Sequence, residues 1–361
     1  MNTNKPLADD SPSDPSTPVF SPRLQQAKQW LREVFGDATF SLQAVSADAS
    51  FRSYWRVYRQ GQSHILMDAP PDHEDCRPFC HVAQKLTAAG VHVPRILARN
   101  LTDGFLLLED FGNQDYLQAL NEVVESIPCE DNIHPEVARL YGDALAALLR
   151  MQTATDTTGL PVYDREKLLE EMHLFRDWFL IKHLDASLST ADEKVLTDVF
   201  ACLAENALGQ PRVFVHRDYH SRNLMVVSDN NPGVLDFQDA VIGPVTYDLV
   251  SLFKDCYIKW PSEHIHRWSE EYRQQWQSAN GESIDADQWR RWFDLMGAQR
   301  HLKAVGIFCR LNYRDGKNRY LRDIPRTLSY LHDLAPTYPE LHDLLTLVEN
   351  CRPRITRQCA H

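Results

Sequence analysis

The sequence lacks the patterns of secreted, membrane and zinc-binding proteins. Its eight cysteines include no C-x-x-C pair, and Cys76 and Cys80 are spaced for one helix face rather than for a zinc knuckle. No apolar stretch approaches the roughly 18 residues of a membrane-spanning helix, and no signal-peptide pattern is present. We therefore expect a reduced, cytoplasmic protein that binds no membrane.

Long basic runs are also missing. The formal net charge is −12, which argues against nucleic acid as a partner. The length of 361 residues suits one two-lobed enzyme or two domains, and hydrophobic residues make up an ordinary 43%. Residues 1–20 are rich in Asp, Ser, Thr and Pro, so we expect a disordered N-terminal tail.

The most informative pattern spans residues 213–239. An apolar run leads into the polar stretch His216-x-Asp218-x-x-x-x-Asn223, and a second apolar run, a turn and a third run follow, ending at Asp236. This order predicts a strand, a catalytic loop, a hairpin and an acidic strand end. Phosphoryl transfer to an alcohol needs such a set, with Asp218 as the base and Asn223 and Asp236 holding Mg²⁺ on the nucleotide phosphates.

Two other interpretations of this pattern remain open. Asp and Asn are common in turns, so each residue alone also fits a purely structural role. His216, Asp218 and His220 alternate in a way that suggests a metal-dependent hydrolase, because His suits zinc and carboxylates suit hard metals. A hydrolase would give Asn223 no task, and the sequence contains no second cluster of metal-spaced His.

The remaining periodicities predict an α+β chain with a small antiparallel-sheet lobe and a larger, mostly helical lobe. After Asn113 the pattern is helical apart from the catalytic hairpin, and Thr190-x-x-Glu193 reads as a capping box. The N-terminal elements that we expect are a helix from Pro22 to Phe35, strands at Phe40–Val45, Phe51–Tyr58 and Ser63–Met67, a helix at Cys76–Ala89, a strand at Arg95–Asn100 and a strand at Phe105–Glu109. A long amphipathic stretch covers Lys167–Leu184.

Three motifs resemble the aminoglycoside phosphotransferase superfamily: His216–Asn223, Leu235–Ala240 and Gly243–Val250. Within it, Ile65–Pro71, Phe105–Asp110 and Arg314–Lys317 most resemble kinases that phosphorylate the anomeric hydroxyl of N-acetylmuramate and N-acetylglucosamine in cell-wall recycling. The likeness extends from about Phe40 to about Leu334. It implies a protein-kinase-like fold with a nucleotide-binding lobe at 21–109, a hinge at 110–113 and a catalytic and substrate-binding lobe at 114–361.

The same resemblance implies chemistry and site residues. ATP and Mg²⁺ would be used to make sugar α-1-phosphates, which feed peptidoglycan recycling and the synthesis of UDP-N-acetylmuramate. Backbone groups of Glu109 and Phe111 would bind adenine. His216 would give structural support. An Asp at the start of a helix can cap it, so Asp248 would cap the helix that it begins and brace the catalytic loop.

The third expected strand departs from the protein-kinase pattern, because it lacks the lysine that pairs with the α- and β-phosphates. Arg52 and Arg56 are the candidates to replace this lysine, although both also fit a sheet surface. Ser50 and Phe51 end a loop that would cover the phosphates with backbone N–H groups. This loop carries Ala47 where such loops often carry Gly, so an ordinary hairpin loop is equally compatible.

The acceptor side is marked by charge. Residues 290–326 contain ten Lys/Arg and three Asp/Glu, in a chain that is acidic overall. A basic face fits an anionic acceptor such as the lactyl carboxylate of N-acetylmuramate, and the candidate substrate residues are Asp255, Arg310 and Arg314. A solvated helix face is the alternative. The rival functions are a kinase for another alcohol (an aminoglycoside, choline or another amino alcohol) and a nucleotide-binding pseudokinase without the lysine.

Overall fold

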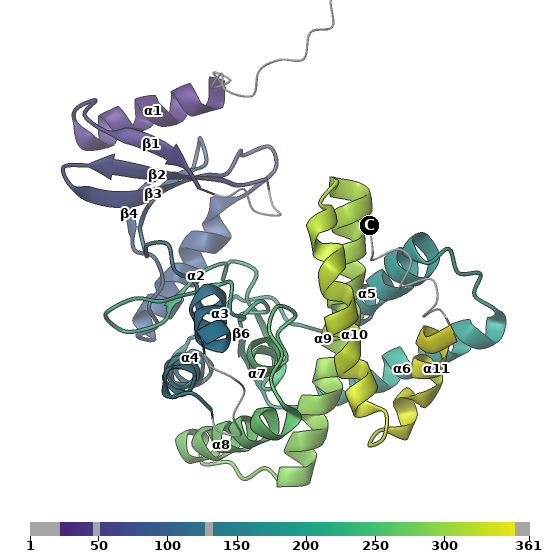
Figure 1. Cartoon of the computed structure of the whole chain (residues 1–361). Helices are drawn as coiled ribbons and strands as arrows, with labels where there is room; N and C mark the ends of the chain where they lie inside the picture. Colours follow the sequence, from purple (N-terminus) through teal and green to yellow (C-terminus); the bar gives the residue numbers. More distant parts are fainter. Residues whose placement is uncertain (1–21, 46–50, 127–132, 351–361) are drawn as a thin grey trace, which may run out of the picture.

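The computed structural model describes residues 22–45, 51–126 and 133–350. A small lobe built on a five-stranded antiparallel sheet lies beside a larger helical lobe (Figure 1). The predicted two-lobed α+β fold is therefore confirmed. The expected disordered tail at 1–20 lies outside the described residues, as do residues 46–50 of the expected phosphate-covering loop.

The small-lobe sheet has a different helix on each face (Figure 1). Successive residues of a strand point to opposite faces, so Phe105 and Leu107 pack with helix α1 while Leu106 and Leu108 join the core shared with helix α2. This explains why all four residues are buried. The elements are α1 (Pro22–Phe35), β1 (Ser41–Ala44), β2 (Ser53–Arg59), β3 (Gln62–Asp68), α2 (Cys76–Ala88), β4 (Ile96–Asn100) and β5 (Phe105–Glu109), and the strand order is β1-β2-β3-β5-β4.

The large lobe consists of helices around two short strand pairs. Strand β6 pairs with β9, and β7 pairs with β8 to form the hairpin of the expected catalytic region. Its helices are α3 (Tyr116–Ser126), α4 (Pro135–Ala154), α5 (Arg165–Leu174), the π-helix η1 (Phe175–His183), α6 (Thr190–Leu208), α7 (Tyr247–Phe253), α8 (Ser262–Asn280), α9 (Ala286–Asp315), the 3₁₀-helix η2 (Asn318–Asp323), α10 (Ile324–Leu334), the 3₁₀-helix η3 (Pro339–Leu341) and α11 (His342–Asn350). The strands are β6 (Arg212–Val215), β7 (Leu224–Met225), β8 (Gly233–Val234) and β9 (Val241–Pro244).

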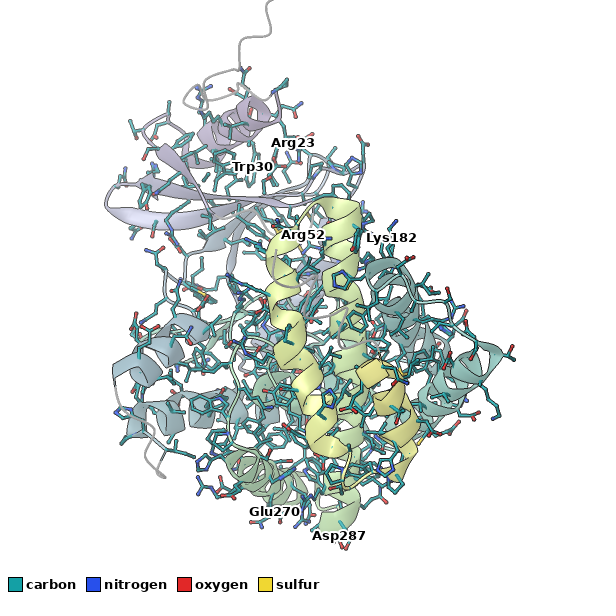
Figure 2. The ribbon with its side chains drawn as sticks, turned by 45° about the vertical axis from the view of Figure 1, so that its right-hand side comes forward. Arg23, Trp30, Arg52, Lys182, Glu270 and Asp287 are labelled. Atoms are coloured by element: carbon teal, nitrogen blue, oxygen red, sulfur yellow. The ribbon has the colours of Figure 1, made fainter. Side chains whose placement is uncertain are left out.

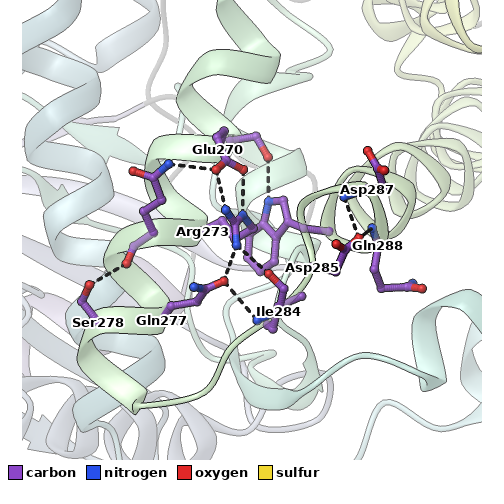
Figure 3. A network of polar contacts seen from close by, with 11 residues as sticks. Glu270, Arg273, Gln277, Ser278, Ile284, Asp285, Asp287 and Gln288 are labelled. Carbon is purple, nitrogen blue, oxygen red and sulfur yellow. Dashed lines mark hydrogen bonds and ion pairs between the residues drawn. The ribbon is translucent and has the colours of Figure 1, made fainter.

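Helix α9 is the central element of the large lobe, and α5, α6, α7, α10 and η1 all pack against it. Its start is fixed by a polar network between α8 and α9 (Figure 3). Arg273 on α8 binds Glu270 and the carbonyl oxygen of Ile284, and Asp285 caps α9 by accepting from the backbone N–H groups of its second and third residues. Among the residues that the structure describes, no helix is long and apolar enough to cross a membrane.

Two local predictions in the large lobe can be compared with the structure. The amphipathic stretch Lys167–Leu184 is helical as expected, and at Phe175 it changes from α-helix to π-helix. The capping box is formed by Ser189 and Asp192, one residue before the predicted pair. Ser189 and Thr190 are both capping residue types, and each has an acidic residue three positions later, so the sequence alone did not distinguish the two registers.

Candidate active site

Two buried carboxylates hold the catalytic loop from behind. Asp248 accepts hydrogen bonds from the backbone N–H groups of His216 (2.7 Å) and Arg217 (3.0 Å). Asp255 accepts from the backbone N–H (3.0 Å) and the hydroxyl (2.6 Å) of Ser221. Both carboxylates are fully buried. The loop backbone is therefore fixed at two points, and burial raises the pKa of Asp248 to about 6. Asp248 does not cap α7 as the sequence suggested, because its oxygens are used by the loop.

Asp218, Asn223 and Asp236 line one cleft of about 700 Å³ between the lobes. The side-chain amide of Asn223 donates to the carbonyl oxygen of Asp218 (2.9 Å), which leaves its amide oxygen as the end that can bind another group. The backbone N–H of Leu235 donates to the carbonyl oxygen of Asn223 (2.9 Å), so the hairpin brings Asp236 back beside the loop. The three residues that the sequence grouped are thus grouped in space.

Backbone strain and a buried imidazole fix the geometry of this group. Arg217 (φ 79°) and Asp236 (φ 61°) adopt the left-handed region that only glycine enters freely, at a typical cost of about 1–3 kcal/mol each. His216 is buried, and burial lowers its pKa, which favours a neutral ring. Its Nδ1 accepts from the N–H of Asp218 (3.3 Å) while its Nε2 can donate to the carbonyl oxygen of Leu235 (2.9 Å). His216 therefore connects the loop to the segment after β8 that carries Asp236.

The charge of Asp218 is set by its neighbours. Burial alone would raise its pKa, but nearby positive charges, with that of Lys303 the strongest and those of Arg300 and Arg217 adding to it, hold the pKa below its ordinary value. Asp218 is therefore ionised at neutral pH and can accept a hydrogen bond from a hydroxyl in the cleft.

The two arginines proposed to replace the missing lysine have different environments. Arg52 donates to Glu74 (2.9 Å) and lies 4.0 Å from a carboxylate oxygen of Asp236, at the boundary between the sheet and the large lobe (Figure 2). Arg56 is bound by Asp110 through two hydrogen bonds (2.6 and 3.0 Å) and stabilises the segment that joins the lobes. Arg56 lines the cleft and Arg52 does not, but of the two only Arg52 lies beside a predicted metal ligand. Its partner Glu74 lies just before α2.

Glu109 and Phe111 line the same cleft as Asp218. The backbone N–H of Glu109 already donates to the carbonyl oxygen of Arg95 (2.9 Å), so this N–H is not available to a ligand. The ring of Phe111 packs so closely on Gly233 that a side-chain carbon there would lie 2.5 Å from the ring. A glycine at this position therefore lets the joining segment contact the catalytic hairpin.

Phe51 does not line the cleft. Its side chain is 66% exposed and its ring stacks on that of His73 at 4.7 Å. Ser50, predicted with it as a nucleotide contact, lies outside the described residues.

The three substrate residues predicted on the acceptor side do not face the cleft. Asp255 is buried behind the catalytic loop, with its second oxygen accepting from the N–H of Tyr257 (2.9 Å). Arg314 is exposed and pairs with its neighbour Asp315 at 2.7 Å. Arg310 is half-buried and absent from the cleft wall. None of the three belongs to the cleft wall, because the sequence locates charge along a helix but not the part of the helix that reaches the site.

Other members of the same basic stretch line the cleft in their place. Arg300 and Lys303 of α9 are both buried and face the cavity, together with Arg319 and Arg322 from the following segment. The ammonium group of Lys303 donates to the hydroxyl of Tyr247 (2.9 Å) and lies 3.3 Å from Glu171. A signal for these positions was present in the sequence, because Arg300 and Lys303 interrupt the most apolar part of a long helix.

Comparison with known proteins gives a family match and named relatives. Residues 41–295 match the phosphotransferase enzyme family. A protein of Pseudomonas putida named N-acetylmuramate/N-acetylglucosamine kinase is 45% identical over 325 residues, covering 87% of this chain and 92% of that protein. A Neisseria meningitidis protein of the same name is 39% identical over 313 residues, covering 85% and 90%.

Solved structures share the fold at much lower identity. An ADP-bound aminoglycoside phosphotransferase superposes with a TM-score of 0.56 at 12% identity, covering 84% of this chain and 97% of the other. A choline kinase from Streptococcus pneumoniae gives 0.54 at 13%, covering 86% and 100%. These similarities establish the fold, and they leave the acceptor to be decided by other observations.

Proposed function

The chain belongs to the phosphotransferase enzyme family, and from this premise we propose that it is an ATP-dependent kinase of N-acetylmuramate and N-acetylglucosamine. The observation that carries the proposal is its likeness, over nearly their whole length, to relatives with that name. This likeness includes the catalytic loop and α9, so it covers both the residues of phosphoryl transfer and the wall that faces the acceptor.

Asp218 would act as the base. Its ionised carboxylate would orient the attacking hydroxyl and accept its proton, and its depressed pKa makes it a weak base. An anomeric hydroxyl is more acidic than other sugar hydroxyls, so a weak base suffices there. We propose phosphorylation at this position, giving the α-1-phosphate for peptidoglycan recycling and UDP-N-acetylmuramate synthesis.

The amide oxygen of Asn223 and the carboxylate of Asp236 would hold Mg²⁺. Both are hard oxygen donors at the edge of the cleft, as Mg²⁺ prefers, and the amide nitrogen of Asn223 is already used elsewhere. Within the described part of the chain no three His, Cys, Asp or Glu side chains cluster as a metal cage. Mg²⁺ usually takes one or two protein ligands and completes its shell with phosphates and water. When bound, it would neutralise charge on the transferring phosphates.

ATP would lie between the lobes, which we propose are divided at residues 110–113. Arg52, held by Glu74 beside Asp236, would contact the phosphates in place of the missing lysine. The carbonyl oxygen of Glu109 and the N–H of Phe111 would bind adenine. We propose a cytoplasmic setting, in keeping with ATP as cosubstrate and with the free thiols of Cys76, Cys80, Cys202, Cys256 and Cys309.

The basic wall of the cleft disfavours the alternative acceptors. Aminoglycosides and choline are cations, and they would meet Arg300 and Lys303 on α9. The pseudokinase alternative is disfavoured because Asp218, Asn223 and Asp236 are all present and lie together.

Product analysis tests the proposal. The protein is incubated with ATP, Mg²⁺ and each of N-acetylmuramate, N-acetylglucosamine, choline and kanamycin, and the products are examined by phosphorus NMR. We expect a phosphate coupled to the anomeric proton with both sugars, and none with an Asp218→Asn variant. A 6-phosphate, or turnover of choline or kanamycin alone, would overturn the proposed substrate. The absence of transfer to any acceptor would favour the pseudokinase.

A further inference from the structure

Arg300 is a buried cation in the cleft with no carboxylate partner among the described residues. Its side chain belongs to a residue that is 5% exposed and that lines the cavity. One of its terminal nitrogens donates to the sulfur of Cys256 at 3.8 Å, a weak contact, and its Nε finds no acceptor. A guanidinium has five N–H donors, so most of its hydrogen-bonding capacity is not used by the protein.

Two other buried cations near α9 are paired with carboxylates. Lys303 is 6% exposed and lies 3.3 Å from Glu171, and Lys254 is 5% exposed and lies 2.7 Å from Asp294. Burying a charge without a counter-charge typically costs several kcal/mol. Asp218 and Asp255 are near enough to favour the charged guanidinium of Arg300, but neither hydrogen-bonds to it, so its spare donors in a ligand cavity point to an anion supplied by the ligand.

The remaining arginines of the cleft are less suited to this role. Arg56 is already bound by Asp110 through two hydrogen bonds. Arg222 lies 3.7 Å above the ring of Tyr257, and Arg319 donates to the hydroxyl of Tyr320 at 3.0 Å. Arg322 is exposed, so water and salt would screen its charge. Arg300 combines burial with spare donors.

Arg300 is also close enough to Asp218 for the two charges to act on each other, since each shifts the pKa of the other. Both residues line the same cleft, so an acceptor whose hydroxyl lies at Asp218 can direct an acidic substituent toward Arg300. The two proposed sugars differ in this respect. N-acetylmuramate carries a lactyl ether with a carboxylate, whereas N-acetylglucosamine has a neutral hydroxyl at the same carbon.

Resting on the proposed function, we propose that Arg300 binds the carboxylate of the acidic acceptor and sets the preference for N-acetylmuramate over N-acetylglucosamine. A planar guanidinium can bind a carboxylate through two parallel hydrogen bonds. The acidic sugar would provide Arg300 with a carboxylate that hydrogen-bonds to it directly, and the neutral sugar would not.

The test compares Arg300→Met with Arg310→Met and Arg314→Met, which remove cations from the same helix outside the cleft. The quantity measured is kcat/KM for N-acetylmuramate divided by kcat/KM for N-acetylglucosamine. This ratio is taken within one protein preparation, so partial misfolding cancels. We expect it to fall roughly 10- to 100-fold in Arg300→Met, the loss typical of a hydrogen bond to a charged group, and to stay within about twofold in the two controls. An unchanged ratio in Arg300→Met would overturn the inference.

A second arm changes the substrate. The methyl ester of N-acetylmuramate keeps the lactyl shape and removes its charge, so the wild-type protein should lose about as much kcat/KM on the ester as Arg300→Met loses on the acid. The variant should be nearly insensitive to esterification. Equal use of acid and ester by the wild type would overturn the inference even if Arg300→Met failed to fold. If the wild type phosphorylates neither sugar, the proposed function fails. If it phosphorylates both and the ratio is the same in Arg300→Met as in the wild type, only the inference fails.

Discussion

The two walls of the cleft use buried charge in opposite ways. On the catalytic-loop wall the buried groups are the carboxylates of Asp248 and Asp255, which accept hydrogen bonds from backbone N–H groups of the loop. On the α9 wall the buried groups are cations, and they differ from each other. Lys303 lies beside Glu171, whereas no carboxylate of the described residues forms an ion pair with Arg300. The loop wall therefore fixes geometry that any acceptor would use, and the α9 wall presents charge that can distinguish one acceptor from another.

The largest expected effect comes from the loop wall. Asp218→Asn removes the proton acceptor and leaves the fold intact, so kcat should fall roughly 10²- to 10⁴-fold. Calorimetry with ATP and Mg²⁺ provides the control, because the affinity for the nucleotide should change by no more than a few fold. Turnover near that of the wild type would show that Asp218 is not the base and would contradict the division of roles between the two walls.

Glu171→Gln removes the carboxylate that neutralises Lys303 on the α9 wall. Glu171 is buried and pairs with the buried Lys303 and the half-buried Arg217, so its loss leaves both cations without their carboxylate. We expect the free energy of unfolding to fall by about 3–5 kcal/mol in urea denaturation. The neighbouring Glu170→Gln is the matched control, because Glu170 pairs with Lys167 at the surface and should contribute about 0–1 kcal/mol. Equal stability of the two variants would contradict the assignment of Glu171 as a buried counter-charge.

Asp248 predicts a pH dependence for the loop wall. Burial raises its pKa to about 6, above the value near 4 of an unfolded chain, so the folded state holds the proton more tightly. Its contribution to stability is then fully present below pH 4 and is lost as the pH rises through 6. The stability of the wild type relative to Asp248→Asn should fall by about 2–3 kcal/mol between pH 4 and pH 7. The exposed Asp198→Asn serves as control, and a constant difference across this range would show that Asp248 stays ionised.

Arg52 belongs to neither wall, and its substitution shows whether acceptor choice is confined to α9. Arg52→Ala should raise the KM for ATP about tenfold, because a charged contact to the phosphates is lost. The ratio between the two sugars should not change. Arg77→Ala, an exposed arginine of the same lobe, is the control. If Arg52→Ala does not change the KM for ATP, the phosphates are bound by another cation or by the loop backbone.

The loop wall could be predicted from sequence because its residues form a short, local pattern. Asp218 and Asn223 are five residues apart on one loop, and a tight hairpin brings Asp236 back to them. The two-lobed fold followed from strand and helix periodicity in the same way. Of the ion pair between Arg52 and Glu74, only Arg52 was predicted, because the two residues are brought together by the tertiary fold.

The α9 wall could be predicted only as a region of positive charge. Arg300, Lys303 and Ile307 recur at three- and four-residue spacing and face the cleft together. Arg314 lies on nearly the same stripe, but 14 residues along an α-helix amount to about 21 Å, which takes it beyond the cavity. Charge counting treats these arginines alike, and packing against α5, α7 and α10 decides which of them is buried beside Asp218.

The most direct test of the division between the two walls is a crystal structure with N-acetylmuramate, Mg²⁺ and a non-hydrolysable ATP analogue. We expect the anomeric oxygen within hydrogen-bonding distance of the Asp218 carboxylate and the lactyl carboxylate bound to Arg300. A sugar that presents another hydroxyl to Asp218, or that directs its carboxylate away from α9, would contradict the account.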